Sequence, residues 1–321
     1  MGGLVKVLLR ALAAALLVSL LSWSLVECAP GSTAHRAAVA ARAIAPGDLS
    51  TPVEVSATIT SELAEQHGLD APFPQRLAER ALGTLHMDFG KSWRDGQPAS
   101  SGLLGLAGLT SLSLVLCALA VAFLAGVFGA VASARRPSSL GRSLWSVYAA
   151  LVLTLPLPWL AMMAIEALAY GHPLALLPAG GSGTLAQGVL PVLVLASAPA
   201  AVLWHHGYVE MRSLYGSDWV LSARASGLAP NRLWRVYILK AAMPTLLTLL
   251  PALLAYLVGA TVVVEYVFAI HGAGSLVARA ALAGDAPVLI AAAVLCAILI
   301  SLATSAANRL ACRLDPRRGA Q

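Results

Sequence analysis

The side chains that could carry out catalysis or hold a metal ion are few and scattered in this sequence. His205 and His206 are adjacent, so on a helix their rings point about 100° apart and do not share one metal ion easily. The four cysteines form no CxxC pair and no Cys/His spacing typical of zinc, and we interpret them as small apolar residues. They are Cys28, Cys117, Cys296 and Cys312. The sequence therefore predicts no metal site and no cofactor.

Acids inside apolar runs are the other candidates for chemistry, and two stand out, Glu166 and Glu265. A charged group within a membrane helix is costly and faces the protein interior, water or a partner. We interpret Glu166 as a residue at the membrane interface, whereas Glu265 either fixes the end of its helix or lines the mouth of a pore. These acids lie far apart in sequence, and no GxxxxGK[ST], HExxH or GxSxG motif occurs. The sequence thus predicts neither an enzyme nor an ATP-binding loop.

The composition is that of a membrane protein. Of the 321 residues, 59% are hydrophobic and 11% are charged, whereas a soluble domain usually carries about 25% charged residues. The net charge of +6 does not indicate a nucleic-acid-binding protein, because the charges lie in short loops between apolar runs. We therefore expect most of the chain to be embedded in membrane lipid.

Six apolar runs are long enough to cross a bilayer, which requires about 20 residues of helix. The sequence therefore predicts an all-α integral membrane protein with six transmembrane helices. They are expected at about Leu8–Val26, within Ser101–Ala134, and at about Leu144–Ala169, Leu185–Trp204, Met243–Tyr266 and Pro287–Asn308.

The distribution of lysine and arginine predicts the orientation of these spans, because cytoplasmic loops carry an excess of both. With the N-terminus inside, the short outer segments contain only Arg279 as a basic residue, and both termini are cytoplasmic. The short cytoplasmic segments then contain Lys6, Arg10, Arg135, Arg136, Arg142, Arg212, Arg224, Arg232, Arg235, Lys240, Arg309, Arg313, Arg317 and Arg318. We expect a multi-pass protein of the inner (plasma) membrane.

The spans divide the chain into four parts. These are the first span with its N-terminus (1–27), an external segment (28–100), a transmembrane core (101–309) and a cytoplasmic tail (310–321). The external segment is too short for an enzyme domain, and its pattern predicts two short helices, Thr58–His67 and Gln75–Leu85, as a small external insertion.

Glycine and proline mark how the spans pack and bend. Glycines in a membrane helix let neighbouring backbones approach closely, and the second span is rich in them. They are Gly102, Gly105, Gly108, Gly126 and Gly129. Prolines in the third and fourth spans are expected to kink or open those helices. They are Pro156, Pro158, Pro191 and Pro199.

The longest polar interval in the C-terminal two-thirds of the chain is Ser217–Pro244, within a loop assigned to 207–242. We expect a short helix that ends at Gly227, since glycine accepts the positive φ of a helix end, and a second helix that starts near Pro230. Asp218 suits the N-terminus of the first helix. Two interpretations remain open on composition: a basic loop that merely anchors the topology, or a rigid surface that a partner can push.

The loops outside this interval resemble one family, the inner-membrane permease subunits of dipeptide, oligopeptide and nickel ABC importers. Within this family, the sequence resembles the subunit that has the larger external loop after its first span. Ala29-Pro30-Gly31 is similar to its APGDP, Gly68-Leu69-Asp70-Ala71-Pro72 to its GLDxP, and Asp88-Phe89-Gly90-Lys91-Ser92 to the start of its GDLGxS segment. Later, Val263–Phe268 with Gly272-Ala273-Gly274 resembles VVVETVFxxPGLG, and Leu314-Asp315-Pro316-Arg317 matches LDPR.

The interval itself resembles the family's coupling loop, DYVRTARAKGL, which stands here as Asp218–Leu228. The resemblance implies a type I importer fold, with Asp218, Leu221, Ala223, Arg224, Gly227 and Leu228 as the surface for an ATPase. Leu221 and Ser226 replace the usual basic residues, and His271 replaces a proline. By the same resemblance, Glu265, Phe268, Gly272, Gly274 and Asp285 are candidates for the pore or its outer gate.

The resemblance also implies the partners. These are a second homologous permease, two ABC ATPase subunits and an external solute-binding protein, and no nucleic acid. The chain would then be the pore-forming subunit of an importer for peptides or a related small solute, driven by alternating access, and would catalyse nothing itself. The alternative is a self-contained channel or secondary transporter. Such proteins often contain inverted repeats and intramembrane ionisable residues. This sequence has no convincing repeat and few charged residues inside its apolar runs.

Overall fold

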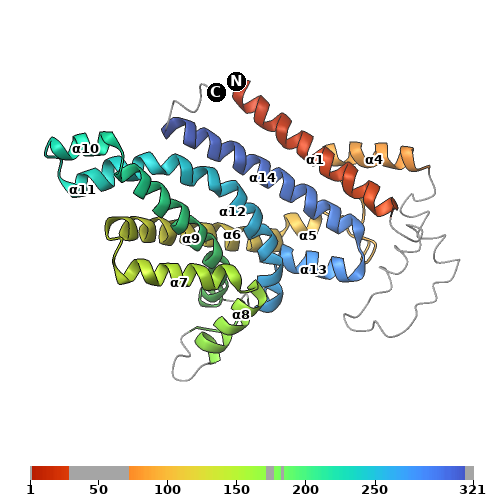
Figure 1. Cartoon of the computed structure of the whole chain (residues 1–321). Coiled ribbons are helices and arrows are strands. Elements are labelled where there is room, and N and C mark those ends of the chain that lie inside the picture. The colour runs from red at the N-terminus through yellow and green to blue at the C-terminus, as the bar shows by residue number, and fades with distance from the viewer. Residues whose placement is uncertain (1, 29–71, 171–176, 182–183, 315–321) are drawn as a thin grey trace. The chain divides into compact units, whose positions relative to one another are not determined.

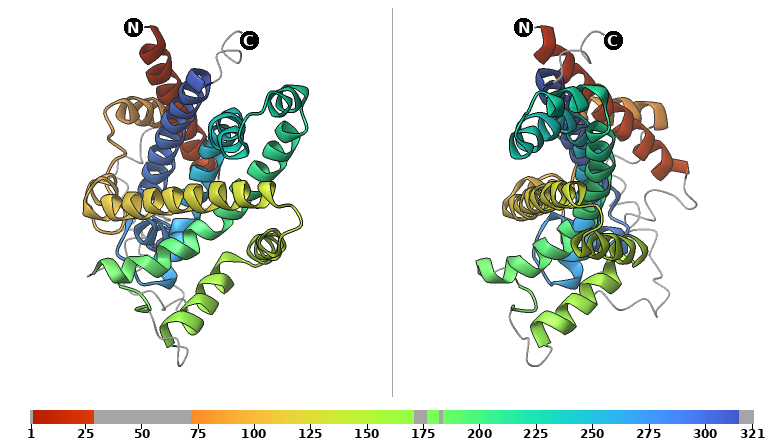
Figure 2. Two further views of the ribbon diagram at one scale, coloured as in Figure 1. Left: turned by 90° about the vertical axis from the view of Figure 1, so that its left-hand side faces the viewer. Right: turned by 60° about the vertical axis from the view of Figure 1, so that its left-hand side comes forward.

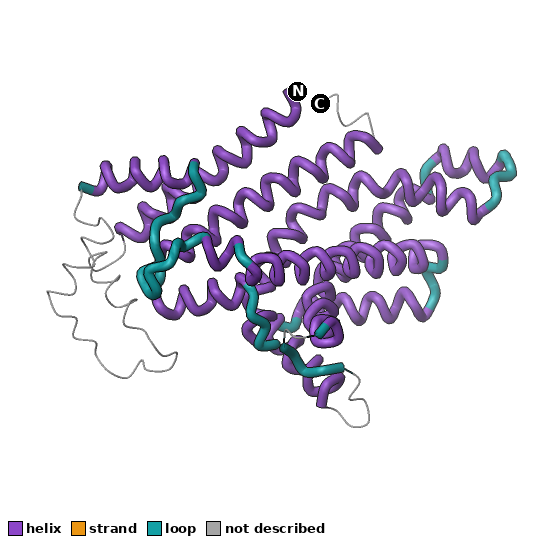
Figure 3. The backbone as a smooth tube through the Cα atoms, turned by 180° about the vertical axis from the view of Figure 1, so that it is seen from behind, coloured by secondary structure: helices purple, strands orange, loops and turns teal. Residues whose placement is uncertain are grey.

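The computed structural model describes residues 2–28, 72–170, 177–181 and 184–314. Within these ranges the regular structure is helical, apart from one isolated antiparallel bridge between Lys91 and Pro98 (Figure 3). The prediction of an all-α membrane protein is therefore confirmed. The helix expected at Thr58–His67 lies outside the described residues, whereas the one expected at Gln75–Leu85 is α4 (Phe73–Leu85).

Five helical stretches in the described part of the chain are long and apolar enough to cross a membrane, and a bent pair of helices makes a sixth if it counts as one span (Figure 1). This agrees with the six predicted spans. The five are α1 (Gly2–Cys28), α6 (Leu106–Arg135), α9 (Leu185–Tyr215), the stretch Pro230–Val267 that ends in α12 (Leu239–Val267), and α14 (Ala286–Leu314).

The bent pair lies where two prolines interrupt the third predicted span. Here α7 (Leu140–Thr154) and α8 (Leu157–Ile165), which continues into the π-helical turn η1 (Glu166–Tyr170), meet at 115°. Pro156 caps α8 and has no N–H to continue the helix from α7. The expected break is therefore confirmed, whereas Pro191 and Pro199 lie inside an unbroken α9.

Two of the helices extend well beyond the apolar runs that predicted them. The fourth span was expected to end near Trp204, but α9 continues to Tyr215. The fifth was expected to begin near Met243, but helical structure begins at α11 (Pro230–Arg232) and continues through the π-helical segment η2 (Leu233–Ile238). The length of an apolar run reflects the thickness of the hydrocarbon layer. The helix itself continues beyond that layer until a helix-breaking residue such as Gly216 ends it. The polar loop between these helices is correspondingly short.

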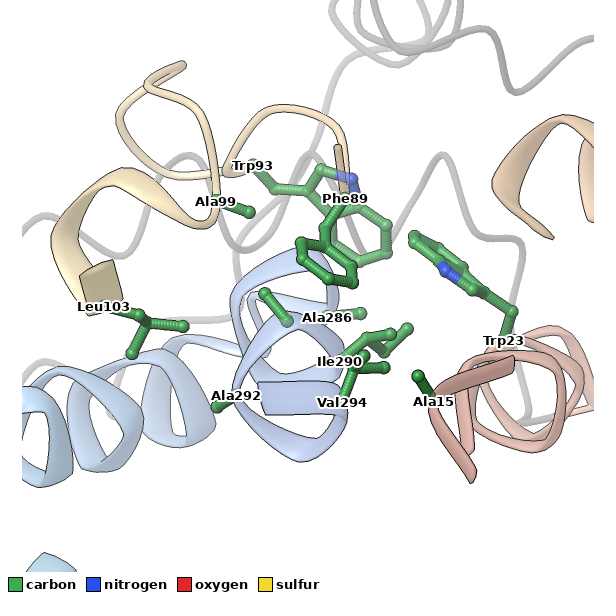
Figure 4. Close-up of a cluster of buried hydrophobic side chains, with 11 residues drawn as sticks. Ala15, Trp23, Phe89, Trp93, Ala99, Leu103, Ala286, Ile290, Ala292 and Val294 are labelled. Atoms are coloured by element: carbon green, nitrogen blue, oxygen red, sulfur yellow. The ribbon is translucent and has the colours of Figure 1, made fainter. Parts of the chain in front are cut away.

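The described helices belong to two compact units. Unit 1 comprises Met1–Ser111 and His271–Leu302, and unit 2 comprises Leu112–Ile270 and Ala303–Gln321. In unit 1, two aromatic residues of the loop after α4, Phe89 and Trp93, pack against the start of α14, and Trp23 of α1 faces the same cluster (Figure 4). The complete cluster is Ala15, Trp23, Phe89, Trp93, Ala99, Leu103, Ala286, Ile290, Ala291, Ala292 and Val294. The stretch that contains Phe89, Trp93 and Ala99 is thus packed against α1 and α14 through this apolar core.

In unit 2, α9 packs along α12 and α7 (Figure 2), and small residues set the approach of α6 to α9. A Cβ atom on Gly126 would lie 2.7 Å from Leu203 Cβ and 2.8 Å from the Ala200 carbonyl oxygen, which leaves no room for a side chain. One turn along, the Trp145 ring occupies the space beside Gly129. The packing role predicted for these two glycines is therefore confirmed.

Gly126→Ala is expected to destabilise the protein by about 1–3 kcal/mol, because the added methyl group forces α6 away from the α9 backbone. The measurement is the temperature of unfolding in detergent, followed by size-exclusion chromatography of heated samples. Gly188→Ala is the matched control, since no atom lies within 4 Å of a Cβ at Gly188. Equal melting temperatures for the two variants would contradict the packing argument.

Candidate coupling loop and outer-end residues

The loop between α9 and α12 has the local structure that its sequence predicts. The helix α10 (Asp218–Ala225) has Asp218 in its first turn, and Gly227 follows it with φ of +77°. The Gly227 N–H donates to the Arg224 carbonyl at 3.0 Å, and the Leu228 N–H donates to the Ala223 carbonyl at 3.2 Å. These bonds close the end of α10, after which α11 begins at Pro230. The sequence Asp218–Pro230 therefore forms a helix, a glycine turn and a second helix.

The exposed surface of α10 includes apolar side chains as well as polar ones. Leu221 is 51% exposed and Trp219 is 42% exposed, whereas Val220 between them is fully buried against the rest of the unit. Leu228 and Ala223 are half-buried. Of the two leucines that the sequence suggested for an apolar contact, Leu221 is the more accessible. The sequence argument missed Trp219, although a large aromatic residue beside Asp218 on a short exposed helix could have indicated it.

Arg224 does not extend freely from α10. Its guanidinium lies 5.3 Å from the centre of the Tyr215 ring, and Arg212 lies 5.8 Å from the same ring. Tyr215 is also stacked with Trp234 of η2, with ring centres 5.1 Å apart and planes at 17°. The stack joins the end of α9 to the beginning of the α11–α12 stretch. Only the turn at Gly227 brings these aromatic residues together, so the sequence alone did not reveal the stack.

A second contact fixes the loop to α6. The guanidinium of Arg135, in the last turn of α6, donates to the Asn231 side-chain oxygen at 2.6 Å. Asn231 is the second residue of α11. The loop therefore has side-chain contacts with α6 and α9, and it continues directly through η2 into α12.

The residues proposed for the outer gate fall in both units. In unit 2, Glu265 and Phe268 lie at the end of α12 and are 0% and 1% exposed. The Gly181 N–H donates to the Phe268 carbonyl at 3.0 Å, and Gly180 lies so close to that carbonyl that a Cβ would be 2.4 Å away. The segment 177–181 therefore covers the end of α12, and the Glu265 carboxylate does not face solvent in this conformation.

In unit 1, Asp285 fastens Ser92 and Trp93 to the start of α14. It is 2% exposed, and its carboxylate accepts a hydrogen bond from the Ser92 hydroxyl at 2.5 Å and one from the Trp93 backbone N–H at 3.1 Å. Gly272 precedes α13 (Ala273–Ala283), and buried Gly274 lies in its first turn. Among the described residues, no three His, Cys, Asp or Glu side chains gather to hold a metal ion.

Tyr215→Leu is expected to weaken the joint between α9 and η2 by about 1 kcal/mol, since it removes an aromatic stack and two cation–π contacts. Tyr215→Phe keeps the ring and is the control. The measurement is protection of the loop from limited proteolysis, which the leucine variant should lower severalfold. If both variants were cleaved at the wild-type rate, the stack would have no role in holding the loop.

Comparison with known proteins agrees with this geometry. Residues 102–319, more than half of the chain, match the family described as "Binding-protein-dependent transport system inner membrane component". A putative peptide transport system permease protein of Brucella abortus is 28% identical over 295 residues, covering 89% of this chain and 88% of that protein. The oligopeptide transport system permease protein of Bacillus subtilis is 26% identical, with coverage of 94% and 93%.

A third relative transports a different kind of solute, according to its name. The metal-staphylopine import system permease protein of Staphylococcus aureus is 27% identical over 264 residues, covering 82% of this chain and 83% of that protein. The family match includes the whole loop from α9 to α12 and all the proposed outer-gate residues. The chain therefore belongs to the binding-protein-dependent inner-membrane components, the permease subunits of ABC importers.

Proposed function

We propose that this chain forms one half of the pore of an importer for peptides or a related small solute. The other half is a second, homologous permease. Two ABC ATPase subunits bind below the pair, and an external solute-binding protein delivers the solute from above. The family assignment supports this arrangement, and the names of the relatives support the solute class, which ranges from peptides to a metal chelate.

The observation that carries the proposal is the loop at Asp218–Pro230. It presents exposed Trp219 and Leu221 on a short helix, and it is tied to α6 by Arg135–Asn231 and to α9 by the Tyr215–Trp234 stack. A short, fixed helix with exposed apolar side chains fits into an apolar groove of a partner and moves with that partner. A flexible basic loop does not transmit such a movement. Since the sequence has no P-loop, ATP hydrolysis in this importer is the task of that partner.

The mechanism that follows is alternating access. ATP-driven closure of the two ATPases moves α10 of each permease, and α9 and α12 move with it because α10 lies between them in the chain. The pore then changes from inward-facing to outward-facing and receives the solute. With both termini in the cytoplasm, α10 lies on the ATPase side and residues 28–100 lie on the side of the solute-binding protein.

The test is reconstitution of the chain with its candidate permease and ATPase partners in lipid vesicles. ATP-dependent uptake of a peptide mixture is expected only when all partners and the binding protein are present. The chain alone should not retain solute-transport activity. Uptake by the chain alone, driven by an ion gradient without ATP, would instead support the channel or secondary-transporter alternative.

A further inference from the structure

The exposed face of α12 differs in composition from the exposed faces of other helices in unit 2. Every leucine and valine of α12 is buried or half-buried. Beyond the first turn, its exposed residues are instead small or carry a hydroxyl group. They are Thr248, Ala252, Tyr256, Gly259 and Tyr266, which we call the α12 face. At 3.6 residues per turn they fall within about 80° of the helix circumference, so they form one continuous face.

The helices α6 and α7 expose the apolar side chains that are expected of a helix in lipid. On α6 these include Leu116, Leu124 and Phe128, and on α7 they include Leu144 and Leu151. Small and polar residues of a membrane helix face other protein or water instead. The α12 face consists of such residues, so its composition is not that of a lipid-facing surface.

Tyr256 carries this argument furthest, because its exposed ring lies near the middle of the span. It stands 13 residues after Met243 and 10 before Tyr266, the ends of the predicted apolar run, which corresponds to roughly 20 and 15 Å of helix. Tyrosine is common at membrane interfaces rather than at the bilayer centre. Within the described residues, no protein group is hydrogen-bonded to the Tyr256 hydroxyl. Since an unpaired hydroxyl in hydrocarbon is costly, this group requires water or a polar ligand.

A helix of another subunit packed against this face is the alternative to a polar path. Small residues such as Ala252 and Gly259 suit close contact between helices. Apart from its own helix, no atom of the described chain lies within 4 Å of a Cβ at Gly259, so the space there is open. However, Tyr256 lies between these two residues on the same face, and its side chain is 41% exposed. The ring would hold a straight neighbouring helix away from both small residues, whereas a polar path accommodates it.

We propose that the α12 face lines the path of the transported peptide, and that the Tyr256 hydroxyl forms hydrogen bonds with the peptide backbone. A phenolic hydroxyl both donates and accepts, so it pairs with an amide N–H or with a carbonyl oxygen. Nearly every peptide unit offers both groups, whatever its side chain. Ala252 and Gly259 leave room for the peptide on either side of the ring along the helix.

The position of this face in the chain connects it to the loop at α10. The helix α12 continues directly from α11 and η2 (Figure 1), so a displacement of the loop also moves the α12 face. The inference rests on the proposed function, because a peptide path requires an importer. The two can fail separately: ATP-dependent uptake by the wild type tests the importer, while the accessibility of Tyr256 tests the path.

The test uses the full chain assembled with its partner permease and ATPases in lipid nanodiscs, where both sides of the membrane are accessible. The four native cysteines of this chain are replaced by alanine. Tyr256→Cys and Ala252→Cys are compared with Leu124→Cys on the exposed side of α6. A charged methanethiosulfonate reagent reacts with thiolates in water, so both α12 variants should react at least about tenfold faster than Leu124→Cys. A mixture of dipeptides and tripeptides should slow these two reactions severalfold.

Three results of the labelling experiment would overturn the proposal. The first is labelling of both α12 variants as slow as that of Leu124→Cys. The second is labelling that is slow in the complex but fast for the chain without its partner permease, since the second permease would then cover this face. The third is fast labelling that the peptide mixture does not slow, because the face would then contact water but no solute.

Tyr256→Phe tests the hydroxyl group itself, since it keeps the ring and removes only the hydrogen-bonding group. ATP-dependent uptake of the peptide mixture in vesicles should fall about threefold to tenfold, as for the loss of one hydrogen bond. The melting temperature and co-purification of the ATPases should stay unchanged. Tyr237→Phe is the matched control, because Tyr237 is 42% exposed but lies in η2, before the apolar run. Wild-type uptake by Tyr256→Phe, or an equal loss in both variants, would contradict the role of the Tyr256 hydroxyl.

Discussion

Gly227→Pro is expected to abolish ATP-driven uptake while the membrane helices stay folded. Gly227 has φ of +77°, and proline is confined to about −65°, so the turn after α10 cannot form. Proline also lacks the N–H that donates to the Arg224 carbonyl at 3.0 Å in the native turn. We expect the change to cost about 3 kcal/mol or more locally, enough to disorder α10. ATP-dependent uptake in vesicles should fall at least about a hundredfold.

The matched control is Gly227→Ala. No atom lies within 4 Å of a Cβ at this position, so alanine meets no obstacle and the cost is the left-handed backbone alone, about 1–2 kcal/mol. The alanine variant should therefore retain measurable uptake and ATPase binding. Co-purification of the ATPases separates docking from transport. Full ATPase retention and uptake by the proline variant would show that α10 is not the coupling element.

The contrast between Gly227 and Tyr215 shows how far the sequence could predict this loop. The end of α10 is a local matter, because one glycine with a positive φ and a proline three residues later define where each helix stops and starts. The Tyr215–Trp234 stack is not local, since it depends on the direction in which the chain returns after the turn. Sequence patterns therefore predict the helices of the loop, and only the fold shows what holds them.

The membrane spans illustrate the same division. Apolar runs predict the number of spans because a bilayer requires about 20 apolar residues, whatever the tertiary structure. They do not predict that α9 continues to Tyr215, since polar residues outside the hydrocarbon can remain helical. They also do not predict the 115° bend at Pro156, because proline indicates a break but not its angle. Nor do they reveal α4 beside α1, which depends on side-chain pairing across the chain.

The contact between Asp285 and Ser92 is another consequence of the fold. The motif Asp88–Ser92 and the candidate gate residue Asp285 lie far apart in the sequence, and nothing in their spacing joins them. The structure shows that Ser92, in the motif, and the adjacent Trp93 donate the hydrogen bonds that Asp285 accepts. A residue proposed for the outer gate therefore has a structural task, which is to hold the 88–98 segment against the start of α14.

Asp285→Ala is accordingly expected to release that segment. The substitution leaves the Ser92 hydroxyl and the Trp93 N–H without their acceptor in a site where Ser92, Trp93 and Asp285 are at most 4% exposed. Each unsatisfied buried group costs about 1–3 kcal/mol, so the total is about 2–5 kcal/mol. The melting temperature in detergent should fall by several degrees, and proteolysis within the 88–98 segment should become markedly faster.

Asp285→Asn distinguishes loss of the hydrogen bonds from loss of charge. The asparagine oxygen can still accept from the Trp93 N–H, but its amide faces a Ser92 oxygen that already accepts from the Arg94 and Asp95 N–H groups. We therefore expect a melting temperature between those of the wild type and the alanine variant. If the asparagine variant were as unstable as the alanine variant, the carboxylate charge beside the first turn of α14 would be the dominant contribution. A wild-type melting temperature for both would show that the apolar cluster around Phe89 and Trp93 alone holds the segment.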